Sequence, residues 1–324
     1  MATYTLAKAL NEGLRRAMED DPKVLIMGED VGKLGGVFRV TDGLQKDFGE
    51  DRVIDTPLAE SGIVGSAIGL AMRGYRPVCE IQFDGFVYPA FDQIVSQLAK
   101  VHNRSKGRTR LPVTIRIPFG GGIGAVEHHS ESPEAYFVHT AGLKVVACSN
   151  AVDAFHMIQQ SIASDDPVIF FEPKRRYWER AELDPSLAPD PLHSARVLRP
   201  GRDVTVAAYG PMVRVALDAA AAAEDDGHQL EVIDLRTLSP LDTETVLESV
   251  RRTGRLVVVH EAPATLGVGA ELAARVTEEA FYSLQAPVLR VTGFDTPYPS
   301  SRLEEDFLPD LDRVLDAVDR SLGF

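Results

Sequence analysis

The amino-acid sequence predicts an α/β fold with mainly parallel sheets, arranged as two successive domains. Short β-rich apolar runs alternate with helix patterns along almost the whole chain. These runs are nearly continuously apolar, which is typical of parallel strands buried on both faces of a sheet. The chain also has 324 residues, which is long for one ordinary core and favours two domains.

The first half of the chain begins this alternation. Its predicted helices are 5–19, 61–73, 89–102 and 151–164, and its predicted strands are 24–28, 76–83, 112–119, 143–149 and 167–173. Asn150 is a good capping residue for the last of these helices, and Asp153 in the first turn suits the positive end of the helix dipole. We assign residues 1–180 to the first domain.

A segment rich in proline and charge interrupts the pattern at 173–202. Such composition is typical of a connection between domains, so we place the linker at 181–202 and the second domain at 203–324. The alternation then resumes, with predicted strands at 203–210, 230–238, 255–262 and 288–294 and predicted helices at 211–226, 241–253, 268–282 and 304–322.

The composition argues against nucleic acid and membranes as partners. The chain has 34 basic and 48 acidic residues, and a net charge of -14 disfavours binding to a phosphate backbone. No apolar run approaches the roughly 20 residues that span a bilayer, and the first residues lack the apolar core of a signal peptide. We expect a cytoplasmic protein in which Cys79 and Cys148 are buried, reduced thiols.

Candidate site residues follow three of the predicted strands. Ligands of open α/β sheets bind beyond the carboxyl ends of the strands. The sequences at those ends are GEDVG at 28–32, QFDGFVYPAF at 82–91 and GGGIGAVEHHSES at 120–132. Each places polar or aromatic side chains where a ligand is expected.

The glycine-rich stretch 120–124 does not have the pattern of a dinucleotide-binding loop, because the third glycine and the following helix are missing. We expect a flexible loop that carries His128 and His129. These histidines lack further ligands at zinc spacing, so we predict no metal site. They are either surface residues or a proton donor or anion clamp.

Glu60 allows two interpretations. An acid in the first turn of a helix gains stability from the helix dipole. Alternatively, the small residues Ser61 and Gly62 leave room for a flat ring to approach a reactive carboxyl group. The aromatic residues Phe86 and Tyr88 are likewise either core or a stacking wall for a ring.

Several motifs together carry a resemblance to a known family. They are GEDVG (28–32), GGVFRVTDGL (35–44), DTPLAESGIVG (55–65), EIQF (80–83), HSESPEAYFVHTAGLKVV (129–146), FFEPKRRY (170–177), HEAP (260–263) and TGFDTPYP (292–299). With these motifs in this order, the chain resembles the β subunit of thiamine-diphosphate-dependent 2-oxo acid dehydrogenases. The resemblance covers essentially the whole chain and implies a transketolase-like pyrimidine-binding domain followed by a transketolase C-terminal α/β domain.

The resemblance also implies the roles of individual residues. Glu60 matches the catalytic glutamate, which hydrogen-bonds the pyrimidine ring of the cofactor. The other positions that match the cofactor pocket are Glu29, Leu58, Ala59, Gln82 and Phe86. His129 matches a catalytic histidine that acts on the substrate carboxylate and on acyl transfer to the lipoyl arm. The substrate contacts are expected at Phe86, Val87, Tyr88, Pro89 and His129.

Two residues depart from the family pattern. Phe86 stands where many relatives have tyrosine, so a hydroxyl group is missing. Glu131 stands where relatives have glutamine, and its negative charge is expected to raise the pKa of His129.

One absence predicts a partner chain. The family holds the cofactor's diphosphate through Mg²⁺ and a GDG motif, and no GDG occurs in this chain. The resemblance therefore implies an α subunit that holds Mg²⁺, an α2β2 heterotetramer with shared cofactor, and an E2 acyltransferase whose lipoyl and subunit-binding domains contact it. A structural K⁺ near Thr114 and Ser164 is a further expectation from some relatives.

Two questions about function stay open in the sequence. GGVFR and the EIQF region favour a branched-chain 2-oxo acid over pyruvate as substrate. The chain could also serve mainly as a scaffold that supports the α subunit and docks E2 through an acidic C-terminal surface. That surface would comprise Glu304, Glu305, Asp306, Asp310 and Asp312.

Overall fold

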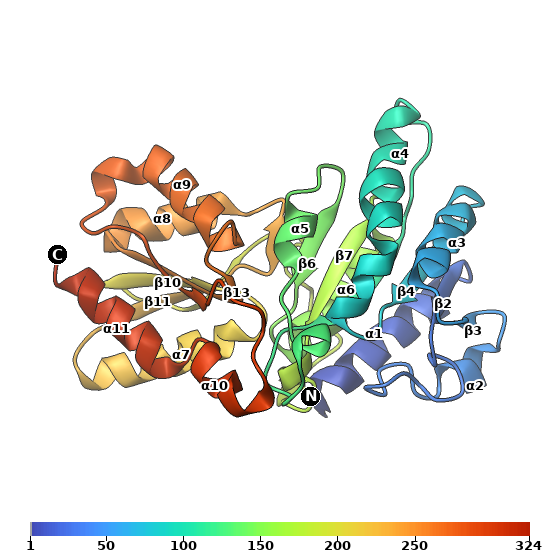
Figure 1. Cartoon of the computed structure of the whole chain (residues 1–324), viewed down its shortest axis with the longest axis horizontal. Coiled ribbons are helices and arrows are strands. Elements are labelled where there is room, and N and C mark those ends of the chain that lie inside the picture. Colours follow the sequence, from blue (N-terminus) through green and yellow to red (C-terminus); the bar gives the residue numbers. More distant parts are fainter. Residues whose placement is uncertain (1) are drawn as a thin grey trace.

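The computed structural model describes residues 2–324 and contains two α/β units lying side by side (Figure 1). The first unit is built on a seven-stranded sheet. In spatial order its strands are β12 (Thr237–Ser239), β6 (Lys144–Ala147), β7 (Val168–Pro173), β5 (Thr114–Phe119), β4 (Arg76–Glu80), β2 (Val24–Gly28) and β3 (Val53–Asp55). All neighbours pair in parallel except β12, which is antiparallel to β6.

The second unit is built on a five-stranded sheet. Its order is β14 (Leu289–Gly293), β13 (Leu256–Pro263), β10 (Val204–Ala208), β11 (Leu230–Asp234) and β9 (Arg196–Arg199). Only β9 is antiparallel. Every residue of β2, β5, β7, β10 and β11 is buried, so the prediction of mainly parallel, doubly covered strands is confirmed.

Helices cover both faces of the first sheet (Figure 1). They are α1 (Leu6–Asp20), α2 (Leu44–Phe48), α3 (Glu60–Met72), α4 (Ala99–Arg104), α5 (Glu134–Val138) and α6 (Ala151–Ala163), with short turns η1 (Asp84–Ala90), η2 (Gln93–Leu98), η3 (Glu127–His129) and η4 (Lys174–Arg176). The Asn150 side chain accepts a hydrogen bond from the Asp153 amide at 3.0 Å, as the predicted cap of α6 requires.

The predicted helix 89–102 differs from the observed structure. The segment begins inside η1, a 3₁₀ helix, continues as η2, a π-helical turn, and becomes α-helical only at Ala99. Pro89 lies inside η1, and its missing amide hydrogen removes a donor from the start of a regular α-helix. The irregular segment immediately follows β4 and therefore shapes the edge where ligands are expected.

The helices of the second unit follow the predicted positions with one break. They are α7 (Met212–Asp225), α8 (Thr243–Thr253), α9 (Val268–Ala280), α10 (Glu304–Phe307) and α11 (Leu311–Leu322), with turns η5 (Phe281–Ser283) and η6 (Ser301–Leu303). The predicted helix 304–322 is split between α10 and α11. Pro309 cannot donate to a continuing helix, and the Asp310 side chain caps α11 by accepting from the Arg313 amide at 2.8 Å.

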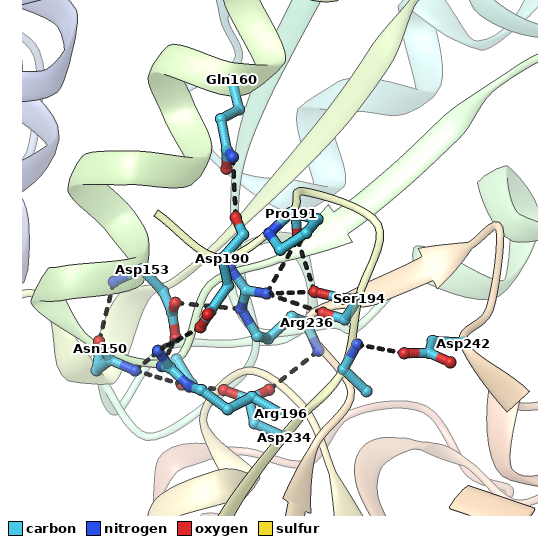
Figure 2. A network of polar contacts seen from close by, with 12 residues as sticks. Asn150, Asp153, Gln160, Asp190, Pro191, Ser194, Arg196, Asp234, Arg236 and Asp242 are labelled. Carbon is cyan, nitrogen blue, oxygen red and sulfur yellow. Dashed lines mark hydrogen bonds and ion pairs between the residues drawn. The ribbon is translucent and has the colours of Figure 1, made fainter. Parts of the chain in front are cut away.

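The segment 181–202 connects the two units and also contains strand residues. β8 (Arg180–Leu183) pairs with β1 (Ala2–Thr5) in a small antiparallel sheet, and β9 joins the sheet of the second unit. A partly buried polar network holds the rest of the segment (Figure 2). In it Arg236 donates to the Ser194 carbonyl at 2.8 Å and to Asp153 at 3.1 Å, and Arg196 donates to Asp153 at 2.7 Å.

The two units share one hydrophobic core. Phe119 and Phe171 from the first sheet belong to the same buried cluster as Tyr209 and Ile233 from the second. β12 crosses back from the second half of the chain to complete the first sheet. Both cysteines are free and buried, as predicted. Within residues 2–324, no helix has the length and apolar character needed to cross a bilayer.

Candidate active site

The three predicted strand ends meet at one edge of the first sheet. β5, β4 and β2 are adjacent and parallel, so their carboxyl ends point the same way. GEDVG follows β2, the η1 turn follows β4, and the glycine-rich stretch follows β5. The candidate residues therefore lie around a common edge, as expected for a ligand site of an open α/β sheet.

Glu60 is the first residue of α3, and its side chain is buried. Ala59 precedes it without making a side-chain cap, and Leu58 is 79% exposed. The small residues of α3 keep this helix start uncrowded, since a Cβ on Gly62 would meet only Ala59 Cβ, at 3.6 Å. The helix start thus combines a buried carboxyl group with the exposed side chain of Leu58.

Glu29 lies close enough to Glu60 for the two carboxyl groups to affect each other. Burial raises the pKa of Glu29, and the negative charges of Glu60 and Asp30 raise it further. The Glu29 Oε1 atom is buried and has no hydrogen-bond partner within the described chain. An unpaired buried oxygen of this kind is costly, so the site is suited to a ligand that supplies a donor.

Gln82 extends this polar edge. Its side-chain amide donates a long hydrogen bond of 3.4 Å to Asp30 Oδ2. Gln82 and Asp30 therefore connect the residues after β4 to those after β2.

Aromatic rings surround His129. The centroid of its imidazole lies 4.2 Å from that of Phe83 and 5.3 Å from that of Phe86, both in edge-to-face arrangements. Gly85 makes this packing possible, because a Cβ there would lie 2.5 Å from the carbonyl oxygen of His128. The η1 and η3 turns can therefore approach only through a residue without a side chain.

The pKa of His129 is lowered, mainly by burial and further by the positive charges of Lys174 and His128. The expectation that Glu131 raises this pKa is wrong. The Glu131 carboxylate instead accepts from the hydroxyl of Tyr88 at 3.2 Å. His129 is therefore held as the neutral imidazole at physiological pH.

The other expected substrate residues differ in exposure. Tyr88 is 40% exposed and Pro89 is also exposed, while the Val87 side chain is buried in the core. Tyr88 and Glu131 line a cavity of about 110 Å³ together with Glu261 and Tyr298 of the second unit. This cavity lies beside the segment that carries His129, between the two units.

Buried charged residues near the site were not identified from the sequence. Arg116 donates to Glu172 at 2.6 Å and to Glu80 at 2.5 Å, and the Tyr177 hydroxyl donates to Glu172 at 2.6 Å. Lys174 forms an ion pair with Asp84, and both side chains are fully buried. For Glu80, Arg116 and Glu172 the sequence signal is a charge inside an otherwise apolar strand, because buried charges need partners.

The predicted acidic surface near the C-terminus needs a correction. Glu304 is buried and accepts from the amides of Gly122 and Gly124, at 2.9 Å each. It also accepts from the Tyr298 hydroxyl at 2.7 Å. Glu304 is therefore not part of a surface, whereas Glu305, Asp306, Asp310 and Asp312 are exposed.

The described residues around Glu60 offer the kinds of group that a pyrimidine ring needs. The buried Glu60 carboxyl, the unpaired Glu29 oxygen and the exposed Leu58 offer both hydrogen bonding and an apolar wall. Residues 2–324 contain no group of three or more His, Cys, Asp or Glu side chains placed to hold a metal. The Ser164 carbonyl accepts from the Arg76 guanidinium at 3.0 Å, and a potassium ion near Thr114 and Ser164 stays a prediction.

The domain matches define the class of protein. The pyrimidine-binding domain of transketolase matches residues 2–179, and the transketolase C-terminal domain matches residues 193–314. A chain described as split gene transketolase, inactive beta4 tetramer, has a TM-score of 0.83 over 98% of both chains at 24% identity. A transketolase of Pichia stipitis gives 0.76 over the whole of this chain and 46% of its own, at 15% identity. The fold is that of transketolase-type proteins.

More similar relatives define the family within that class. The pyruvate dehydrogenase E1 component subunit beta of Leifsonia xyli subsp. xyli is 64% identical over 98% of this chain and 95% of its own length. The 3-methyl-2-oxobutanoate dehydrogenase subunit beta of Mycobacterium tuberculosis is 57% identical over 99% of this chain and 92% of its own. The chain belongs to the β subunits of the E1 components of 2-oxo acid dehydrogenases.

Proposed function

We propose that this chain and an α-type partner decarboxylate a branched-chain 2-oxo acid with thiamine diphosphate and transfer the acyl group to the lipoyl group of E2. The observation that carries the proposal is the edge formed by Glu60, Glu29, Gln82 and Phe86 beyond β2 and β4. It offers paired carboxyl groups in a partly dry site, which suits proton sharing with a ring nitrogen.

Thiamine diphosphate, when bound, supplies an electron sink for the loss of carbon dioxide from a 2-oxo acid. Glu60 would hold the pyrimidine ring nitrogen and share a proton with it. Burial and the nearby negative charge of Glu60 raise the pKa of Glu29, so the two carboxyl groups act as an interacting pair beside the ring. Leu58 and Ala59 would form the wall on one side of the ring, and Gln82 and Phe86 would complete the pocket.

His129 would act on the substrate carboxylate and in transfer of the acyl group to the lipoyl arm. Its lowered pKa keeps a neutral imidazole that can both donate and accept a hydrogen bond. Phe86 fixes the ring by edge-to-face packing, and Tyr88 and Pro89 are exposed beside it. The buried Val87 would contribute through its backbone.

The chain needs a partner to complete this site. It has no GDG motif for the cofactor's diphosphate, and we propose that an α subunit holds the diphosphate and Mg²⁺ in an α2β2 heterotetramer. A direct test compares turnover of the purified chain with that of the chain reconstituted with an α-type subunit, both with cofactor and Mg²⁺. Activity should require the α subunit, and full turnover by the chain alone would refute the shared site.

The substrate preference is the finer part of the proposal. GGVFR and the EIQF region favour a branched-chain substrate, while the 64% identical relative from Leifsonia is named for pyruvate. Pyruvate is therefore the alternative. The ratio of kcat/KM for 3-methyl-2-oxobutanoate to that for pyruvate, measured on the tetramer, separates them. A ratio well above one supports the branched-chain proposal, and a ratio well below one assigns pyruvate.

The chain can bind E2 as well as take part in catalysis. The exposed acids Glu305, Asp306, Asp310 and Asp312 would face a basic module of E2. Reversing two of these charges should lower the affinity for E2 and make that affinity less sensitive to salt. Turnover measured in the absence of E2 should not change. If the chain served mainly as a scaffold, replacing Glu60 would leave turnover unchanged.

A further inference from the structure

The glycine-rich stretch 120–124 is anchored to carboxylates of the second unit. The Gly121 amide donates to Glu261 Oε2 at 2.8 Å. The amides of Gly122 and Gly124 donate to the two oxygens of Glu304, at 2.9 Å each. Both glutamates are buried, and the Tyr298 hydroxyl also donates to Glu304 at 2.7 Å. Hydrogen bonds from amides to buried carboxylates are charge-assisted and strong.

The glycines are needed for this close approach. A Cβ on Gly121 would lie 1.9 Å from the Tyr298 hydroxyl oxygen, and one on Gly120 would lie 2.6 Å from Glu261 Oε2. Gly122 has φ +85°, and a Cβ there would lie 2.7 Å from Arg175 Nε. The motif therefore exposes backbone amides to the second unit, which explains three glycines in succession without a phosphate ligand.

The anchored stretch begins a closed loop that carries His129. The Gly120 amide donates to the carbonyl of Glu131 at 3.0 Å, which closes the loop at its base. The Glu131 amide donates to Asp84 Oδ2 at 2.8 Å, and this ties the same base of the loop to η1. His129 lies inside the closed loop, close to Glu131 where both hydrogen bonds meet, so its position depends on how the loop is anchored.

We propose that Glu304, supported by Glu261, is a positioning residue for His129. The carboxylate of the second unit fixes the 120–124 backbone, and the closed loop transmits this position to the imidazole between Phe83 and Phe86. The proposal rests on the proposed function for the role of His129 in acyl transfer. Its structural part, the anchoring of the loop by Glu304, can be tested separately.

The first test measures hydrogen exchange of the loop in the reconstituted α2β2 tetramer. Glu304→Gln keeps the side-chain size but replaces one acceptor oxygen by an amide nitrogen, so one of the two glycine amides loses its partner. Exchange of the amides in 120–124 should become about tenfold faster, because one charge-assisted hydrogen bond is lost. Glu279→Gln, an exposed acid on α9, is the matched control and should leave this exchange unchanged. Unchanged exchange in Glu304→Gln would overturn the proposal.

The second test asks whether the anchoring acts through His129. Transfer to a free lipoyl domain should fall about 10–100-fold in Glu304→Gln, since small displacements of a reacting group have effects of this size. The variant should bind thiamine diphosphate like the wild type. The double variant Glu304→Gln/His129→Ala should be no slower than His129→Ala alone. Multiplied losses in the double variant would show that Glu304 acts independently of His129 and would overturn the positioning role.

A second variant covers the case in which Glu304→Gln does not fold. Gly124→Ala perturbs the same hydrogen bond from the loop side, because φ is +71° there while the nearest atom to a Cβ is Ser301 Cβ at 3.9 Å. It should reproduce both effects. Normal transfer by His129→Ala would refute the assigned role of His129 and with it the positioning role, whereas the exchange result would still decide whether Glu304 anchors the loop.

Discussion

The buried ion pair between Asp84 and Lys174 gives a quantitative prediction. Both side chains are fully buried, and Asp84 also accepts from the Glu131 amide at the base of the His129 loop. Burial raises the pKa of Asp84 to about 6, so the carboxylate is ionised at neutral pH. Burial lowers the pKa of Lys174, and the negative charge of Asp84 opposes that change. The pair therefore consists of two charges that depend on each other.

Asp84→Asn leaves the ammonium of Lys174 buried without its counter-charge. Breaking a buried pair from one side costs about 3–5 kcal/mol, against a total stability of about 5–15 kcal/mol. For a domain of this size, the midpoint of thermal unfolding should fall by about 6–20 °C. The measurement is differential scanning fluorimetry of the tetramer at neutral pH and fixed protein concentration, since assembly also affects the midpoint.

The double variant Asp84→Asn/Lys174→Met separates the ion pair from general packing. With both charges removed, no charge is left unpaired, so the double variant should be more stable than either single variant. A coupling of at least about 1 kcal/mol is expected between the two sites. Additive losses, or a midpoint of Asp84→Asn within about 2 °C of the wild type, would refute the reasoning.

Three further predictions concern other positions in the structure. Burial raises the pKa of Glu134 from 4.5 to about 7, so its contribution to stability is full below about pH 4.5 and is lost as the pH rises through about 7. As the pH rises from 4.5 to 8, the wild type should lose up to about 3 kcal/mol of unfolding free energy that Glu134→Gln, which cannot ionise, retains. Equal pH dependence of the two unfolding midpoints would contradict this. Gly85→Ala should slow lipoyl transfer more than cofactor binding, because the new methyl group displaces His128, and unchanged transfer rates would count against that packing. Arg236→Met leaves the buried Asp153 with fewer partners and should lower the thermal midpoint by several degrees, whereas the exposed Arg302→Met should not.

Much of the fold follows from local patterns. β2, β5 and β7 are continuous apolar runs because both of their faces are covered, and this pattern is visible in one sequence. β9 and β12 were not distinguished as antiparallel edge strands because their pairing depends on distant strands rather than on their own composition. The break between α10 and α11 carried a local signal in Pro309 and Asp310, which the apolar periodicity concealed.

The candidate site likewise has one part that local sequence patterns predict and one part that depends on tertiary packing. Glu29, Gln82 and Glu60 meet at one edge because parallel strands share the direction of their carboxyl ends, and this is a rule of topology. The partners of the His129 loop follow no such rule. Glu304 is 182 positions from Gly122, and only the packing of the second unit brings them together. The same packing explains why an acid expected on the surface is buried.

The central claim is that Glu60 belongs to a shared active site and does not merely stabilise the start of α3. The most direct test is turnover of a 2-oxo acid by the reconstituted tetramer carrying Glu60→Gln. A glutamine retains the size of the side chain but cannot share a proton with a ring nitrogen as a carboxyl group does. We predict a loss of at least about 100-fold in kcat with the tetramer intact, in line with removal of a general acid–base group. Near-wild-type turnover by the assembled variant would contradict the account.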